Sequence, residues 1–226
     1  QKARKVIAVS QNTRKDLIKF YRVSDNKIKV VYNGYEKQEK GTKTRSQSTS
    51  SPYILYVGTL QPRKNVSTLI RAFNKFKISN KEFKLVIVGR KGWLYKEIFE
   101  LVQQLKIEKE VVFTDYISDA ELIELYKNAY CFVLPSLYEG FGIPVLEAMS
   151  NDCPVICSNV SSLPEIGGNA ALYFNPKNVK ELLKKLDEVK NETLRDQLIK
   201  KGKEQIKKFS WQKCAQETLE VIRSAI

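Results

Sequence analysis

Two carboxylates in the segment LYEGFGIPVLEA, residues 137–148, have the types and spacing of groups that could hold a ligand. Glu139 and Glu147 are separated by seven residues, and the triplet Gly-Phe-Gly at 140–142 directly follows the first acid. Glycines let backbone amides approach a ligand closely, and Pro144 suits the first turn of a helix. We therefore expect a loop and a helix N-terminus that face a ligand, with one acid on either side.

The ligand that suits two such acids carries hydroxyl groups on both sides of a phosphate. Two carboxylates cannot both face a phosphate, because like charges repel. Carboxylate oxygens do accept hydrogen bonds from neighbouring hydroxyls. A nucleotide sugar, with its ribose, diphosphate and hexose, fits this pattern. The alternative, in which the acids only cap a helix and face water, stays open.

Cations follow two other segments that resemble buried strands. In VGTLQPRKN, residues 57–65, Gly58 allows a turn, and Arg63 and Lys64 stand at the start of a helix, where cations oppose the helix dipole. A bound diphosphate would explain their place, through charge-assisted bonds and helix amides. The segment is not a Walker loop, because its second glycine and the Ser or Thr after lysine are missing. VGRKGW at 88–93 is a weaker signal, since such strand–turn–helix connections are common.

Composition excludes several kinds of chemistry. The chain of 226 residues has no histidine, so it contains no Ser-His-Asp triad and no histidine base. The four cysteines lack the spacing of zinc or redox sites, and we expect buried thiols in a reducing cytoplasm. No apolar run reaches the roughly 18–20 residues of a membrane span, and no signal peptide opens the sequence. We expect a cytoplasmic protein with no metal or cofactor.

The net charge of +14 favours an anionic partner. Nucleic acid is disfavoured, because no zinc-finger or aromatic RNA-binding signature accompanies the charge. The cations are spread along the chain, and those at 177–208 have the spacing of solvated helix faces. A phosphorylated small molecule and a peripheral site on an anionic membrane surface both stay open, as does solubility alone.

Short apolar runs alternate with helical patterns along most of the chain. A parallel sheet buried on both faces has such nearly continuous apolar strands, so we predict an α/β fold, a Rossmann-like open parallel sheet with helices on both faces. Ser118 and Glu121 have the spacing of a capping box, which predicts a helix start. Ligands of such sheets bind at the carboxyl ends of the strands. The expected strands are 53–58, 84–89, 110–116, 131–136, 154–158 and 171–174.

The first residues differ from the rest. Residues 1–35 read as one strand–helix–strand unit, which is too small to bury both faces of a sheet. Residues 36–52 are rich in Ser, Thr, Lys and Gln and have no apolar period. We therefore predict a hinge element from the end of another domain at 1–35, a mobile linker at 36–52 and a ligand-binding domain at 53–226.

Three segments together resemble one family. EGFGIPVLEAM resembles the E-x7-E motif of retaining glycosyltransferases of family 4, which have the GT-B fold. YVGTLQPRKNVSTLIRAF is similar to the phosphate-binding segment of that family, and the first 35 residues resemble the element that closes its N-terminal domain. The resemblance implies a metal-independent transfer of a hexose, with retention, from a nucleotide sugar to a polysaccharide or lipid-linked acceptor.

The resemblance also implies roles for individual residues. Arg63 and Lys64 correspond to the cations that hold the donor diphosphate, Glu139 to the acid near the transferred sugar, and Glu147 to the acid that binds the ribose. Catalysis is therefore expected from Glu139, Arg63 and Lys64. The other expected donor-binding positions supply backbone amides, a base-reading surface and strand ends: Gly58, Thr59, Gly89, Arg90, Tyr116, Ile117, Gly140, Phe141, Gly142, Ile143, Val145 and Leu146.

Two departures limit the resemblance. Many relatives have arginine where Thr59 stands, and the GTL-PRKN variant is similar to that of mannosyl- and rhamnosyltransferases, which favours GDP-mannose over a UDP-glucose-type donor. Complete enzymes have a further N-terminal acceptor domain with a catalytic histidine. This chain resembles the C-terminal, donor-binding half, inactive alone, whose acceptor domain is in cis or in a separate subunit. A non-catalytic regulatory or scaffold subunit that binds nucleotide sugar is the alternative.

Overall fold

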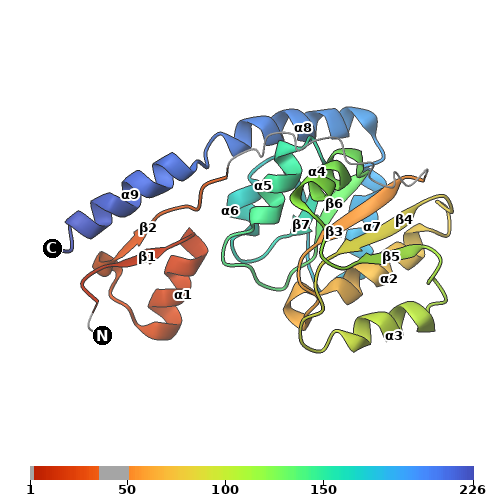
Figure 1. Ribbon diagram of the computed structural model, residues 1–226, viewed down its shortest axis with the longest axis horizontal. Helices are drawn as coiled ribbons and strands as arrows, with labels where there is room; N and C mark the ends of the chain where they lie inside the picture. The colour runs from red at the N-terminus through yellow and green to blue at the C-terminus, as the bar shows by residue number, and fades with distance from the viewer. Residues whose placement is uncertain (1–2, 36–50) are drawn as a thin grey trace.

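The computed structural model describes residues 3–35 and 51–226 (Figure 1). Most of the expected linker at 36–52, and its predicted mobility, falls outside the described residues. The described chain consists of a small N-terminal unit, a six-stranded sheet with helices around it, and a long C-terminal helix that returns to the N-terminal unit.

The six-stranded sheet is parallel throughout and contains all six expected strands. Its strand order is β5-β4-β3-β6-β7-β8. From β3 the chain builds outward through β4 and β5, then crosses to the other side of β3 to form β6, β7 and β8. The carboxyl ends of β3 and β6 are therefore the topological switch point, where ligands of open sheets bind. The strands are β3 (Tyr53–Val57), β4 (Lys84–Val88), β5 (Val111–Thr114), β6 (Cys131–Leu134), β7 (Val155–Ser158) and β8 (Ala171–Phe174).

Helices cover both faces of this sheet, as predicted. On one face α2 packs beside α3 and α7, and on the other α5 packs beside α4, α6 and α8 (Figure 1). The capping box predicted at Ser118 is present, because Ser118 Oγ accepts from the Glu121 amide and the Glu121 carboxylate accepts from the Ser118 amide. The helices are α2 (Val66–Phe76), α3 (Lys96–Gln104), α4 (Asp119–Asn128), α5 (Ile143–Ser150), α6 (Leu163–Gly167), α7 (Val179–Glu188) and α8 (Glu192–Ile206).

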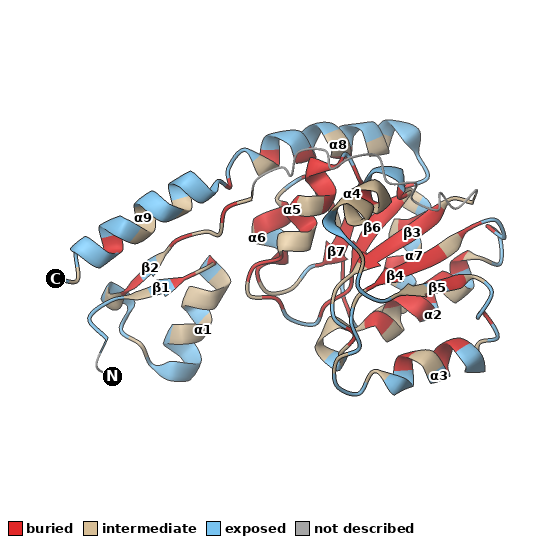
Figure 2. Cartoon of the chain, in the orientation of Figure 1, coloured by how far each residue is buried: buried red, intermediate tan, exposed pale blue. Residues whose placement is uncertain are grey.

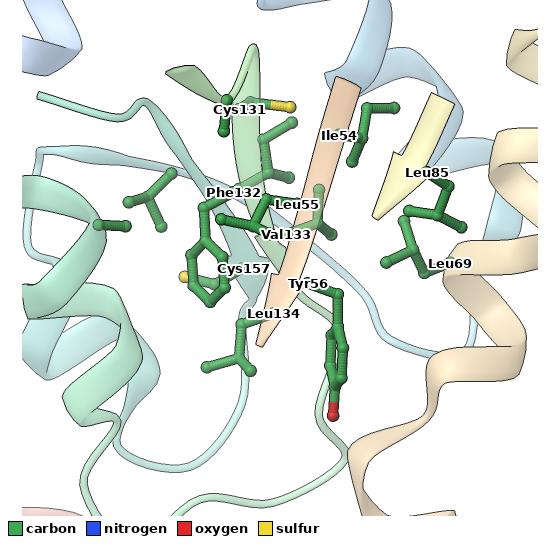
Figure 3. Packing of buried hydrophobic residues seen from close by; sticks show 14 of the residues in the cluster. Ile54, Leu55, Tyr56, Leu69, Leu85, Cys131, Phe132, Val133, Leu134 and Cys157 are labelled. Carbon is green, nitrogen blue, oxygen red and sulfur yellow. The ribbon is translucent and has the colours of Figure 1, made fainter. Parts of the chain in front are cut away.

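The core lies between these layers and includes the two central strands, β3 and β6 (Figures 2 and 3). Leu55 of β3 and Phe132 of β6 are fully buried and pair across the sheet. All four cysteines are free thiols, three of them buried and Cys214 half-buried. Burial raises the pKa of the Cys131 thiol to about 12. The packed strands form a rigid base for the loops at their carboxyl ends.

The N-terminal unit is a parallel two-stranded sheet with one helix, separate from the large sheet. It comprises β1 (Val6–Ala8), α1 (Gln11–Tyr21), a 3₁₀ turn η1 (Asp25–Lys27) and β2 (Ile28–Val30). None of the residues of α1 is buried. Helix α9 (Trp211–Arg223) runs along the unit, and Figure 1 shows the two side by side. The division of the chain into hinge element, linker and donor domain stays a prediction.

Candidate functional site

Two charged loops meet at the switch point of the sheet. After β3 the chain turns through Gly58 into the 3₁₀ turn η2 (Pro62–Lys64), which contains Arg63 and Lys64. After β6 it passes Ser136 and reaches Glu139, whose carboxylate is buried. The three side chains expected to be catalytic therefore lie together, although the cations and the acid are about 75 residues apart in sequence.

The carboxylate of Glu139 is bound on both oxygens. Lys64 Nζ lies 2.6 Å from Oε1 and Arg63 Nη1 lies 3.1 Å from Oε2. Ser136 Oγ donates a third hydrogen bond, 2.6 Å from Oε1. The structure places the two cations and Glu139 in direct contact. Their expected roles, the cations at the diphosphate and Glu139 at the sugar, stay predictions.

Electrostatics keep Glu139 ionised. Burial raises the pKa of its carboxyl group, but the charge and hydrogen bond of Lys64, the hydrogen bond of Ser136 and the charge of Arg63 lower it more, so the pKa lies below its ordinary value. Two cations and one anion leave the cluster with a net positive charge. The Arg63 side chain is 40% exposed, compared with 13% for Lys64. The cluster can therefore present positive charge to an anion in the solvent.

Asn65 fixes the loop that carries the cations. It adopts a left-handed conformation, with φ 54°, which asparagine tolerates better than most residues. Its side-chain Nδ2 donates to the carbonyl of Pro135, 2.9 Å away, and to that of Pro176, 2.8 Å away. The Leu137 amide donates to the Arg63 carbonyl, 2.8 Å away. The cation loop is thereby tied to the loop that follows β6.

The other strand-end residues line the same edge of the sheet. Gly58 and Gly89 follow adjacent strands, and a Cβ on Gly89 would lie 2.0 Å from the Gly58 carbonyl oxygen, so glycine is required for this approach. Thr59 and Arg90 are exposed. The Arg90 guanidinium lies 5.0 Å from the centre of the Tyr116 ring, the residue expected to read a base. Ile117 beside it is half-buried against the core.

The loop at the start of α5 presents backbone more than side chains. The Phe141 ring is buried and packs on Tyr32 and Phe209, with ring centres 6.3 and 5.7 Å away. Gly142 has φ 117°, a conformation that favours glycine. The Val145 amide donates to the Gly142 carbonyl, 3.0 Å away, and so is engaged within the first turn of the helix. Ile143 is half-buried, and Gly140 and Leu146 flank this turn on either side.

Glu147 lies in a different environment from Glu139. Tyr126 donates to Glu147 Oε2 over 2.9 Å, and no cation contacts the carboxylate among the described residues. Burial raises the pKa of the Glu147 carboxyl group, the Tyr126 hydrogen bond offsets part of this effect, and the charge of Asp119 adds to it. Glu147 lines a cavity of about 50 Å³ together with Tyr35, Asp119, Leu122, Ile123, Tyr126 and Asn151.

Several residues of the site were missed by sequence reasoning. At Glu139, Ser136 donates to the carboxylate, Ser161 accepts from the backbone amide, and Ser162 donates to the backbone carbonyl. At Glu147, Tyr126 donates to the carboxylate. Ser136 ends an apolar run and could have been found from that position, but nothing local marks the others. In the described part of the chain, no group of three or more Cys, Asp or Glu side chains could hold a metal ion. Nor is any helix there long and apolar enough to cross a membrane.

The fold matches solved glycosyltransferases. A glycosyltransferase from Rickettsia africae superposes with a TM-score of 0.83 at 20% identity, covering 98% of this chain and 63% of that one. HepE from Anabaena, solved in complex with UDP-glucose, gives 0.85 at 20% identity, covering 98% of this chain and 64% of that one. The open sheet with its charged switch point is thus the Rossmann-like C-terminal half of a GT-B fold.

Sequence comparison identifies the family. Residues 37–205 match the model for glycosyl transferases group 1, and residues 1–39 match the model for glycosyltransferase family 4. The chain therefore belongs to the group 1 glycosyl transferases, which confirms the family expected from the E-x7-E motif.

Named relatives include two mannosyltransferases. O-antigen chain mannosyltransferase B of Escherichia coli is 38% identical over 169 residues, which cover 74% of this chain and 44% of the relative. O-antigen chain mannosyltransferase RfbU of Salmonella typhimurium is 34% identical over 180 residues, covering 80% and 49%. The chain spans about half the length of these relatives.

Proposed function

We propose that this chain is the donor-binding half of a retaining glycosyltransferase. It would take a hexose from a nucleotide sugar and pass it to a polysaccharide or lipid-linked acceptor. The observation that carries this proposal is the contact of Arg63 and Lys64 with buried Glu139 at the switch point of the sheet. The acceptor domain would be supplied in cis or as a separate subunit.

The chemistry assigned to this half is stabilisation of the leaving group. When the bond between the anomeric carbon and the diphosphate oxygen breaks, its electron pair stays on the diphosphate. Arg63 and Lys64 would stabilise that growing negative charge. Glu139 holds the two cations in place and keeps its own negative charge near the sugar. The new bond forms between the anomeric carbon and the acceptor oxygen, whose hydroxyl proton leaves with the nucleoside diphosphate, and no nucleophile from this chain is assigned.

The donor that we propose is GDP-mannose. The mannosyltransferase names of the E. coli and Salmonella relatives support mannose. A UDP-glucose-type donor is the alternative, supported by the UDP-glucose complex of the Anabaena neighbour. The ribose is assigned to Glu147, where Tyr126 donates to Oε2 and no hydrogen bond to Oε1 is found among the described residues. We propose that donor binding needs no metal. We also propose that the protein is cytoplasmic, with a peripheral site at the cytoplasmic face of the membrane.

Calorimetric titration of the chain with GDP, UDP, GDP-mannose and UDP-glucose tests this proposal. We expect binding of at least one nucleoside diphosphate and its sugar conjugate. Arg63→Ala should weaken that binding at least tenfold, the effect of losing a charged hydrogen bond. Arg71→Ala, an exposed arginine on the adjoining helix, is the matched control and should bind like the wild type.

Two results would contradict the proposal in different ways. If none of the four ligands binds the wild type, the assignment of a donor site to this chain is wrong. Robust transfer to an acceptor by these 226 residues alone would show that the chain is more than a donor-binding half. Slow hydrolysis of the donor is compatible with the proposal.

A further inference from the structure

The backbone carbonyls of the loop 139–141 are held by side-chain hydroxyls rather than by other backbone groups. Ser162 Oγ lies 2.9 Å from the Glu139 carbonyl oxygen and 2.7 Å from that of Phe141, so one hydroxyl proton is shared between two carbonyls. Ser162 is fully buried. A buried hydroxyl in this position fixes the direction of two peptide groups at once.

The carbonyl between them, that of Gly140, is held by side chains of the N-terminal unit. The Gly140 carbonyl oxygen accepts from Ser10 Oγ over 2.8 Å and from Thr13 Oγ1 over 3.2 Å. Ser10 is fully buried and caps α1, since its Oγ accepts from the Thr13 amide. The N-terminal unit therefore contributes directly to the shape of this loop.

Fixing the carbonyls also fixes the amides. In a trans peptide the N–H points away from the C=O of the same peptide group. The amides of Gly140 and Gly142 must therefore point away from Ser162, and that of Phe141 away from α1. Within the described residues these three amides have no hydrogen-bond partner. They are free donors in the loop that directly follows Glu139, whose carboxylate contacts Arg63 and Lys64.

Ser162 does not cap its own helix with its side chain. It stands at the N-cap of α6, where a serine oxygen ordinarily accepts a hydrogen bond from its own helix. Here it makes no such cap bond, and its hydroxyl serves the loop instead. Three residues further on, Glu165 accepts from the Gln11 amide over 2.8 Å and from the Tyr32 hydroxyl over 2.6 Å. Helix α6 thus holds both the loop and the N-terminal unit.

We propose that Ser162 is a positioning residue that aims the free loop amides at the donor, with Ser10 and Thr13 fixing the middle peptide. This inference rests on the proposed function, since the donor is the ligand that the amides would bind. It predicts that donor affinity depends on a hydroxyl that contacts no ligand itself. It also makes the N-terminal unit part of the donor site.

The test compares Ser162→Ala, Thr13→Val and Ser158→Ala by titration with GDP, UDP and their sugar conjugates. Ser162→Ala should weaken binding about tenfold, and Thr13→Val, which keeps the shape and removes one hydroxyl, about threefold. Ser158 is a fully buried serine whose hydroxyl lies near the Leu134 carbonyl instead, so Ser158→Ala should bind like the wild type. Ser162→Thr, which keeps the hydroxyl, should restore most of the affinity.

A spectroscopic measurement separates positioning from simple stability. In ¹⁵N-labelled wild type, the Gly140 and Gly142 amide signals should shift on nucleotide binding, and these shifts should shrink in Ser162→Ala. Equal affinity and equal shifts in wild type and Ser162→Ala would overturn this inference alone. Absence of nucleotide binding by the wild type would overturn the proposed function with it. If Ser162→Ala does not fold, wild-type affinity of Thr13→Val overturns the inference.

Discussion

Glu139 and Glu147 belong to one motif, yet their surroundings shift their pKa values in opposite directions. Both carboxyl groups are largely buried, which raises the pKa of each. At Glu139 two cations and a serine hydroxyl outweigh burial, so its pKa is lowered. At Glu147 the hydrogen bond from the neutral Tyr126 hydroxyl offsets only part of the effect of burial, so the pKa of Glu147 is raised. The pKa values of two identical side chains therefore shift in opposite directions because their partners differ.

The comparison indicates a division of work within the site. Glu139 remains ionised and holds the cations that would meet a diphosphate. Among the described residues only one oxygen of Glu147 has a hydrogen-bond partner, and the side chain lines a small cavity, which suits hydroxyl recognition better than charge compensation.

Removing Lys64 should have the largest effect. Lys64→Ala leaves the buried Glu139 carboxylate with Arg63 and Ser136 only, and we expect a loss of about 3 kcal/mol in the free energy of unfolding. Lys77, paired with Glu110 at 2.8 Å, is a more exposed ion pair, and Lys77→Ala should cost about 1 kcal/mol. Urea unfolding measures both values.

A double variant sharpens this result. Adding Glu139→Gln to Lys64→Ala removes the unpaired charge and should recover part of the lost stability, since the two residues interact directly. Strictly additive losses would show that the ion pair does not act as a unit.

Ligand titration should separate the two glutamates. Glu147→Gln should weaken both the nucleoside diphosphate and the nucleotide sugar by about 1.5–3 kcal/mol, roughly ten- to a hundredfold. Glu139→Gln should weaken the nucleotide sugar by a similar amount and leave the nucleoside diphosphate nearly unchanged, because glutamine keeps an oxygen that can accept from the cations and both cations remain. Calorimetry on both variants supplies the four values. Equal losses throughout would mean that the two acids share one role.

Stability should depend on pH with opposite signs at the two acids. The lowered pKa of Glu139 means that its contribution is present above the ordinary value of 4.5 and is lost as the pH falls through its folded pKa. The raised pKa of Glu147 means that its contribution is present below 4.5 and is lost as the pH rises through its folded pKa. Urea unfolding of wild type, Glu139→Gln and Glu147→Gln from about pH 3 to about pH 7 measures both differences. Differences of the same sign would refute the comparison.

Removing metal ions by chelation should not change nucleotide affinity. Arg63 and Lys64 are proposed to stabilise a diphosphate without a metal, so EDTA should leave nucleotide affinity unchanged. The measurement is a titration of wild type with and without EDTA, repeated with added Mg²⁺ or Mn²⁺. A requirement for either cation would show that the cluster does not suffice.

Much of the architecture was predictable because it depends on local patterns. Apolar runs indicated all six strands of the large sheet, and the spacing of Ser118 and Glu121 indicated the start of α4. The chemistry of the site was also visible as residue types, with the cations after one strand and the acids after another. These features depend on neighbours only a few residues away, which is why sequence reasoning finds them.

The contacts that define the site were not predictable in this way. Glu139 meets Lys64 from 75 positions away, and Gly140 meets Ser10 from 130 positions away. The family resemblance assigned the cations to the diphosphate and Glu139 to the sugar, which stays a prediction, and it did not indicate that these side chains contact each other. It also gave Ser162 no role, because the ordinary role of a serine at that position is to cap its own helix.

Residue types and their local spacing specify which side chains have the chemistry to contact phosphate and hydroxyl groups, and which segments become strands and helices. Which of these residues touch depends on how the whole chain folds. The crossing of the chain from β5 to β6 places the loops after β3 and β6 side by side, and that crossing results from packing the whole sheet. Burial in that packed arrangement then sets the opposite pKa shifts of Glu139 and Glu147, because desolvation and partner charges exist only once the chain has folded.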